Sequence, residues 1–308
     1  MVAPANSFLA ALKLFQNGHF TEAQRRLNDI VQVDPQQTEA WHLLGLIEFQ
    51  KSNFNDAVKH FHRAVQFDPF SAKYLTNLGS AWHALGETRE ATTCFERAVA
   101  ADPHCAESHT YLGIIRLQQE SLDAAEACLQ TALLDAPQSW QARLNLGNVF
   151  RERRQLEQAA EQYELALSID PDSAEALLNL GELRVEQGRT VEAVPHLRRA
   201  AALRPRVAEI RFRLADALRE IGEHAEAITA YQRALSFKAS SFDGWVGLGQ
   251  SSAALEQWSD AVASFRNAVS LQPDSAAAHS HLGEALRRSG NSDEAARHLA
   301  VASVLELK

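Results

Sequence analysis

The sequence of 308 residues has only three cysteines and no run of 18 or more apolar residues. Three cysteines cannot form the disulfide framework of a small secreted protein. A membrane-spanning helix needs about 20 consecutive apolar residues, so none is expected. The first six residues also lack the basic segment of a secretory signal. These absences predict a cytoplasmic protein with no membrane partner.

Basic residues are also in short supply, with 30 Lys and Arg against 39 Asp and Glu and a net charge of −9. Because nucleic acid binding depends on a basic surface, nucleic acid is not expected as a partner. The motifs H-E-x-x-H, C-x-x-C, G-x-S-x-G and G-x-x-x-x-G-K-[ST] are absent from the sequence. We therefore expect no enzyme activity, no metal and no cofactor.

What the sequence does contain is a period of 34 residues. One phase is alanine in all nine periods, from Ala23 to Ala295, and glycines keep two further phases. Seven of the nine prolines share one phase: Pro35, Pro69, Pro103, Pro137, Pro171, Pro205 and Pro273. The skipped proline place is Ala239. Such a period is the signature of a repeat architecture, with repeats starting at residues 4, 38, 72, 106, 140, 174, 208, 242 and 276.

Each repeat is expected to form two amphipathic helices, because its apolar residues recur three or four apart. With position 1 at residue 4, small residues at positions 8 and 20 let the two helices approach closely. The large apolar residue at position 24 is expected to fill the space between neighbouring repeats. Glycine at position 15 is expected to supply a positive φ between the helices, and proline at position 32 to end the second helix.

These residues resemble the tetratricopeptide repeat, whose pattern W-x-x-L-G, A-x-x-x-F, P is present outright. Trp41 to Gly45, then Ala57, Phe61 and Pro69, is one clear instance. The resemblance covers residues 4–308. It implies an all-α solenoid, a right-handed superhelix of nine helix-turn-helix units in a single array, whose first helices line a concave groove.

In that family, positions 2, 5, 6, 9, 12 and 13 of each repeat face the groove. They give an apolar set, Phe8, Leu12, Phe15, Leu46, Phe49 and Tyr111, and a polar set, Asn145, Asn148, Arg151, Asn179, Arg213 and Arg219. This division suits a protein or peptide partner with an apolar segment and a polar or acidic one. The alternative for the apolar set is packing within the array or against a second copy.

Asn77, Asn145 and Asn179 all occupy position 6. An amide side chain can pair with an extended backbone, and this arrangement resembles the asparagine ladder of the superhelix in O-linked N-acetylglucosamine transferases. The alternative is that each asparagine is simply solvated. The clamp of chaperone-tail adaptors is matched in only three of five places, since Leu144 and Glu209 replace its lysines. A chaperone-tail adaptor is therefore not expected, although Arg151, Arg213 and Arg219 could receive an acidic side chain.

The eighth repeat and the last helix are unusual. The first helix of the eighth repeat contains three glycines, Gly244, Gly247 and Gly249. They predict either a bend or pocket there, or a weak helix held by packing. The last helix, near Lys308, has no polar helix after it. This predicts self-association through uncapped ends, or that the chain is part of a longer protein.

The function predicted from these patterns is a non-enzymatic scaffold that binds a protein or peptide segment in its groove. One alternative is a substrate-recognition module of a larger or associated enzyme, such as a glycosyltransferase. Another is a self-assembling structural component.

Overall fold

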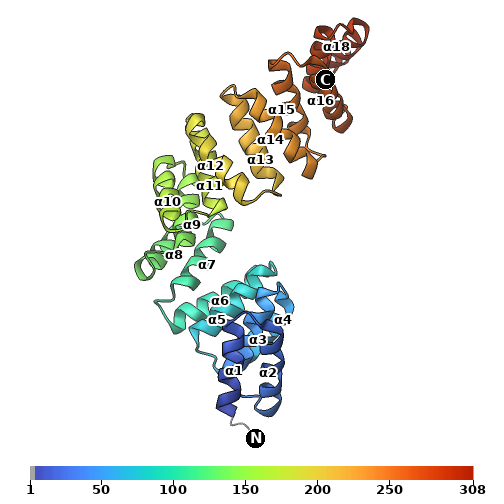
Figure 1. Cartoon of the computed structure of the whole chain (residues 1–308). Coiled ribbons are helices and arrows are strands. Elements are labelled where there is room, and N and C mark those ends of the chain that lie inside the picture. The colour runs from blue at the N-terminus through green and yellow to red at the C-terminus, as the bar shows by residue number, and fades with distance from the viewer. Residues whose placement is uncertain (1–3, 308) are drawn as a thin grey trace. The chain divides into compact units, whose positions relative to one another are not determined.

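The computed structural model describes residues 4–307, and all of their regular structure is helical (Figure 1). The helices are α1 (Pro4–Gln16), α2 (Phe20–Val33), α3 (Thr38–Gln50), α4 (Phe54–Phe67), α5 (Ala72–Ala84), α6 (Thr88–Ala101), α7 (Ala106–Gln118), α8 (Leu122–Asp135), α9 (Trp140–Glu152), α10 (Leu156–Ile169), α11 (Ala174–Glu186), α12 (Thr190–Leu203), α13 (Ala208–Glu220), α14 (His224–Phe237), α15 (Phe242–Ala254), α16 (Trp258–Leu271), α17 (Ala276–Arg288) and α18 (Ser292–Glu306). Each predicted repeat start coincides with the first residue of an odd-numbered helix. The predicted all-α array of helix pairs is confirmed.

The helices gather into two compact units, Met1–Gln155 (unit 1) and Leu156–Lys308 (unit 2). Unit 1 contains α1 to α9 and unit 2 contains α10 to α18, so the boundary lies between the two helices of the fifth repeat. Each unit has its own buried core, around Leu44 and Phe61 in the first and around Leu197 and Leu218 in the second. That the repeats form one continuous array stays a prediction.

Small and large side chains fit together inside the helix pairs. A Cβ added to Gly45 would lie within van der Waals overlap of the Phe61 ring, and Gly79 is covered in the same way by Phe95. The predicted role of the small residue at position 8 is therefore confirmed. The prediction for position 24 was incomplete, because its large side chain fills space inside its own pair and not only between neighbouring repeats.

The turn inside each pair has one backbone conformation. Position 15 has a positive φ in all nine repeats. Five of these residues are glycines, as predicted, with φ from 72° at Gly188 to 88° at Gly290. In the other four repeats Ser52, Glu120, Arg154 and Glu256 adopt φ between 57° and 62°. Residues with a Cβ are strained there, so the packing of the pair imposes this turn even without glycine.

In six repeats the side chain at position 4 fastens the connection to the preceding pair. Trp41 Nε1 donates to the carbonyl oxygen of Pro35 at 2.8 Å, six residues earlier, and Trp245 Nε1 donates to Ala239 at the same distance. His109, Arg143, Arg211 and His279 donate to the corresponding carbonyl as well. Three chemically different side chains thus satisfy one carbonyl group near the end of the preceding helix.

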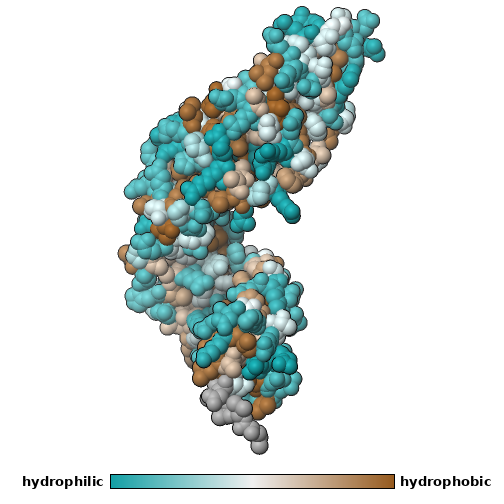
Figure 2. All heavy atoms as spheres, in the orientation of Figure 1, coloured by the Kyte–Doolittle hydropathy of each residue, from teal (hydrophilic) through white to brown (hydrophobic). Residues whose placement is uncertain are grey.

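The surface carries no broad apolar area on the face drawn in Figure 2, where hydrophobic residues form small separate groups among hydrophilic ones. No helix within residues 4–307 is both long enough and apolar enough to cross a bilayer.

Candidate functional site: the inner faces of the first helices

The first helix of each pair is where the sequence places its candidate binding residues. Within unit 1, α1 contacts α3, and α7 contacts both α5 and α9; within unit 2, α13 contacts both α11 and α15. Consecutive second helices are not in comparable backbone contact among the described residues, although side chains bridge them, as Arg198 and Glu226 do between α12 and α14. We call the side of the first helices that bears positions 2, 5, 6, 9, 12 and 13 the inner face of each unit.

The apolar candidates of unit 1 lie on α1 and α3. Phe8, Leu12 and Phe15 are half-buried and pack against the core around Leu27 and Leu44. Leu46 and Phe49 are half-buried too, and the Phe49 ring packs edge-on against Phe54 at 5.2 Å between centroids. These side chains are held by the core on one side and keep the other exposed. Their predicted contact with a partner stays a prediction.

Tyr111 on α7 belongs to an aromatic group between two pairs. Its ring stacks on Phe95 with centroids 4.7 Å apart and planes 5° apart, and it lies 5.6 Å from the His83 ring. The tyrosine is half-buried, so it offers part of a ring face that its own chain holds rigidly.

Asn77 on α5 contacts a buried histidine of the preceding pair. Its Nδ2 lies 2.6 Å from Nε2 of His42, and His42 is only 3% exposed. An amide nitrogen can only donate, so the neutral imidazole accepts at Nε2 and carries its proton at Nδ1. Burial, followed by the charge of Lys73, lowers the pKa of His42 from its usual 6.5 to about 4. This pair therefore joins α3 and α5 without charge.

The remaining asparagines are distributed over both units. Asn145 on α9 donates from Nδ2 to the carbonyl of Gln141 at 2.8 Å, so its amide nitrogen serves its own helix. Asn148 and Arg151 are half-buried on the same helix, and Asn179 is half-buried on α11. The amide nitrogens of Asn77 and Asn145 are thus engaged within the chain, and the ladder that would grip a peptide backbone stays a prediction.

Arg213 on α13 lies between two carboxylates of unit 2. Its Nε is 3.0 Å from Glu182 on α11, and a terminal nitrogen is 3.0 Å from Glu209 on its own helix. An acidic side chain of a partner would have to compete with both. The sequence predicts that Arg213 faces the groove. Its ion pairs with Glu182 and Glu209 are apparent only in the structure.

Arg219 takes part in a second polar group of unit 2, which centres on a tyrosine that the sequence analysis missed. Tyr231 on α14 donates its hydroxyl to Asp216 Oδ1 at 2.5 Å, and Arg219 Nε donates to the same hydroxyl at 3.2 Å. Burial raises the pKa of Asp216 above its ordinary range, although the hydrogen bond from Tyr231 opposes the shift. Burial and the neighbouring Asp216 raise the pKa of Tyr231.

Glycines of α15 make room for these rings. A Cβ at Gly247 would lie 2.4 Å from the Tyr231 hydroxyl oxygen, and one at Gly244 would lie 2.5 Å from the Phe212 ring. The helix runs without a break from Phe242 to Ala254. The predicted space for a bulky side chain therefore exists, and rings of the same chain occupy it. A tyrosine at position 24, facing a glycine at position 6 of the next repeat, was the available sequence signal.

Beside the tyrosine an inner cavity of about 200 Å³ opens on unit 2. It is lined by Glu209, Phe212, Arg213, Asp216, Tyr231, Lys238, Ser241, Asp243 and Gly244. Charged side chains of both signs surround an aromatic floor, which suits hydrogen bonding to a polar segment. Within residues 4–307 no group of three or more histidine, cysteine or acidic side chains is placed to hold a metal ion.

One family model described as tetratricopeptide repeat matches residues 8–72, 178–243 and 246–303, and another of the same description matches residues 83–146. A model described as TPR repeat matches residues 147–188. A search of curated proteins finds no match.

Several solved structures are similar to this chain. A crystal structure of MamA is 27% identical, covers 52% of this chain and 94% of its own, and has a TM-score of 0.51. YrrB, described as a TPR protein with an unusual peptide-binding site, is 23% identical, covers 60% and 95%, and has a TM-score of 0.55. The human IFIT1 dimer with PPP-AAAA is 17% identical, covers 100% and 74%, and has a TM-score of 0.61. The latter two similarities concern the fold alone.

Proposed function

Because this chain belongs to the tetratricopeptide repeat family, we propose that it is a non-enzymatic scaffold that binds a segment of another protein along its inner faces. The observation that carries this proposal is the inner cavity of unit 2, in which Tyr231, Asp216 and Arg213 are held in place by their own neighbours. Side chains that are already ordered lose little entropy when a peptide binds them.

The chemistry of this face favours a polar segment over an acidic one. Arg213 is already paired with Glu182 and Glu209, and Asp216 and Asp243 add negative charge to the cavity wall. On unit 1, the half-buried aromatic and aliphatic side chains of α1 and α3 would take an apolar anchor of a partner segment. YrrB, whose structure is described by its peptide-binding site, shares the fold and supports this choice.

Nucleic acid is the less favoured ligand. IFIT1 shares the fold and is seen with PPP-AAAA. In this chain the net charge is −9, and acidic residues line the inner cavity. A phosphate backbone would meet repulsion there.

Peptide selection with a charge-reversal pair tests the proposal. Peptides of 12 residues would be selected on the immobilised chain from a random library, and their binding would be measured by fluorescence anisotropy. Asp243→Lys changes an exposed cavity residue in the first turn of α15. Asp260→Lys makes the same change in the first turn of α16, away from the cavity.

We expect Asp243→Lys to weaken binding at least tenfold and Asp260→Lys to leave it within twofold. Equal effects of the two variants would refute binding at the inner cavity. Failure to select any peptide, with both variants folded by circular dichroism, would refute the peptide-binding scaffold itself.

Self-association is a second candidate, favoured by the exposed side of α18. Val301, Val304 and Leu307 are 40%, 57% and 86% exposed. Exposed apolar groups at one helix suit contact with a second copy of the chain. Light scattering over a hundredfold concentration range tests this, and a constant monomer mass would exclude it.

A further inference from the structure

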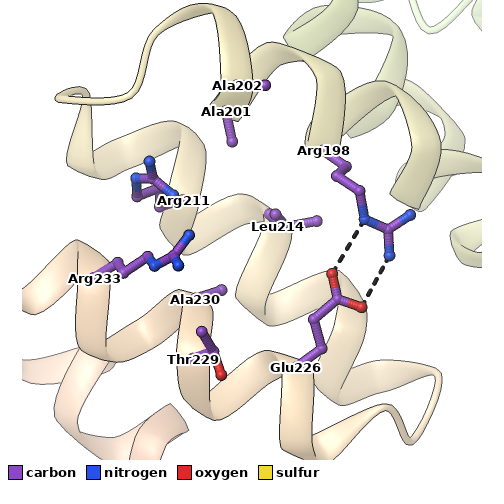
Figure 3. A pocket seen from close by; sticks show the side chains of 9 residues that line it. All are labelled: Arg198, Ala201, Ala202, Arg211, Leu214, Glu226, Thr229, Ala230 and Arg233. Carbon is purple, nitrogen blue, oxygen red and sulfur yellow. Dashed lines mark hydrogen bonds and ion pairs between the residues drawn. The ribbon is translucent and has the colours of Figure 1, made fainter.

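A second cavity of unit 2 lies on the opposite side of α13 from the inner cavity. It has a volume of about 310 Å³ and shares no lining residue with the inner one. We call it the outer pocket; its lining residues are Arg198, Ala201, Ala202, Arg211, Leu214, Glu226, Thr229, Ala230 and Arg233. These residues come from α12, α13 and α14, and the floor between them is apolar (Figure 3).

One wall of the outer pocket is an ion pair. Arg198 on α12 and Glu226 on α14 form two parallel contacts of 3.1 and 3.0 Å, which tie the two second helices together. The charges of this pair offset each other. Figure 3 shows it on one side of Leu214, with Arg211 and Arg233 on the other.

The other wall holds two arginines whose charge is not neutralised. Arg211 uses its Nε for the carbonyl of Pro205 at 3.0 Å, which fixes the side chain and leaves both terminal nitrogens as donors. Arg233 has neither a hydrogen bond nor an ion pair with any residue in the described range 4–307. Two adjacent guanidinium groups without a counter-charge attract an anion.

The same place between α16, α17 and α18 provides an internal comparison. Arg266 and Glu294 repeat the ion pair there, with contacts of 2.8 and 2.9 Å. At the equivalents of Arg211 and Arg233, however, the chain has His279 and Val301. The repeat therefore forms the ion pair without the two extra cations, so those cations are a local addition to the fold.

The surrounding sequence is locally basic in an acidic protein. Residues 184–238 hold eleven of the 30 basic residues and seven of the 39 acidic ones, whereas residues 156–183 hold seven acidic residues and no basic one. This pattern concentrates positive potential on the segment that builds the outer pocket.

We propose that the outer pocket binds a glutamate or aspartate side chain of an acidic peptide segment, with the carboxylate on Arg211 and Arg233. The aliphatic part of the ligand would lie on Ala201, Leu214 and Ala230. No aromatic side chain lines the pocket to stack a base, and the Glu226 carboxylate in its wall opposes a doubly charged phosphate more than a single carboxylate. This site is separate from the inner cavity and does not depend on the function proposed for it.

The test uses a fluorescein-labelled peptide with four alternating glutamates and leucines between glycine-serine flanks. The same peptide with glutamine in place of glutamate, and a labelled single-stranded oligoadenylate RNA, are measured in parallel by anisotropy at two salt concentrations. Arg211→His and Arg233→Val introduce the residues that the ninth repeat carries at these places, and the histidine keeps a donor for the Pro205 carbonyl. Ala202→Leu fills the exposed rim of the pocket without changing its charge.

Arg25→Val is the matched control. It removes one positive charge from an exposed position of a second helix, α2, where Arg25 has no hydrogen bond or ion pair with the residues that the structure describes. Circular dichroism establishes that every variant folds before binding is compared.

We expect the glutamate peptide to bind at least tenfold more tightly than the glutamine peptide. Arg211→His, Arg233→Val and Ala202→Leu should each weaken it at least fivefold, and Arg25→Val should leave it within twofold. Equal weakening by Arg25→Val would reduce the effect to net charge and overturn the proposal. Unchanged binding of the glutamate peptide to Ala202→Leu would also overturn the proposal. The same holds if the RNA binds, and loses binding in Arg233→Val, while the peptide does not bind at all.

Discussion

The inner faces of the two units join neighbouring helix pairs by opposite means. In unit 1 the contact between α3 and α5 is a neutral hydrogen bond, from Asn77 to an uncharged His42. In unit 2 the contact between α11 and α13 is an ion pair, from Arg213 to Glu182. Asn77 and Arg213 both stand at position 6 of their repeats, but His42 is at position 5 and Glu182 at position 9. The repeat therefore sets one side of the contact and leaves its partner and its chemistry open.

The two kinds of contact serve different purposes: the neutral contact of unit 1 contributes to stability, and the ion pair of unit 2 offers groups to a ligand. A buried neutral contact gains its strength from exclusion of water, and it is insensitive to salt as long as the histidine stays neutral. An exposed ion pair contributes little to stability and is screened by salt, but its groups stay available to a ligand. The contact between α3 and α5 is therefore expected to respond to pH, and the contact between α11 and α13 to salt concentration.

Acid should produce the largest effect, and it should act on unit 1. The pKa of His42 is about 4 in the fold and near 6.5 in an unfolded chain, so the unfolded chain takes up the proton first as the pH falls. The stabilisation is complete above about pH 6.5 and is lost progressively toward pH 4, by an amount of about 3 kcal/mol. Hydrogen exchange of α3 and α5, followed by mass spectrometry at pH 7 and pH 4, measures this loss.

His42→Gln removes the most strongly shifted histidine of unit 1 and should reduce this pH dependence, although burial also lowers the pKa of His60 and His83. Exchange in α11 and α13 serves as the internal reference. Equal loss of protection in both units between pH 7 and pH 4 would contradict the assignment to His42.

Removing the tyrosine hydroxyl of unit 2 should have the next largest effect. Tyr231→Phe leaves the half-buried Asp216 without its 2.5 Å donor, which costs about 2 kcal/mol. Tyr74→Phe is the matched control in unit 1, because the Tyr74 hydroxyl makes no hydrogen bond within residues 4–307 and its loss should change stability by less than about 0.5 kcal/mol. Urea unfolding measures both variants, and similar losses would show that the network around Tyr231 adds nothing.

The turns should behave alike in both units, which makes them a reference for the comparison. Glu120→Gly in unit 1 and Glu256→Gly in unit 2 relieve a positive φ of 57° and 58°, and each should stabilise its unit by up to about 1 kcal/mol. Gly222→Ala should destabilise by a similar amount, since the added Cβ meets no atom within 4 Å and only the backbone is strained. Thermal unfolding checks the signs, and a loss on either change to glycine would contradict this account.

The smallest effect is expected at the ion pair of unit 2. Arg213→Gln should cost less than about 1 kcal/mol in 0.05 M salt and close to nothing in 0.5 M salt, because the Arg213 side chain is about half exposed in its pairs with both Glu182 and Glu209. Denaturant unfolding at the two salt concentrations measures this. A large cost that persists in high salt would place Arg213 among the structural residues.

The helix pairs were predictable because each depends on residues that recur every 34 positions. Gly45 beneath Phe61 and the positive φ of Gly188 follow from residue size and backbone freedom, which the sequence states directly. The turns at Glu120 and Glu256 were not predictable from their own residues, since neither favours that φ and only the packed pair imposes it.

The candidate site was predictable in position but not in pairing. Periodicity placed Asn77 and Arg213 on one face of their helices, and each does lie against a neighbouring first helix. Their partners depend on distances between helices, which periodicity does not contain. The outer pocket was not predicted from the sequence, because Arg211 and Arg233 lie outside the positions that the family resemblance assigns to binding.

The carbonyl that Trp41, His109 and Arg211 each satisfy from position 4 has a consequence for how such a protein diversifies. The bond is not required in every repeat, because buried leucines, Leu75 and Leu177, stand at position 4 of the third and sixth repeats. The position therefore accepts apolar side chains as well as several different N–H donors. A mutation from tryptophan to arginine at this point keeps the joint between repeats and adds a cation to the surface in one step. Position 4 is thus a place where a repeat array can acquire a new binding chemistry while its scaffold stays unchanged.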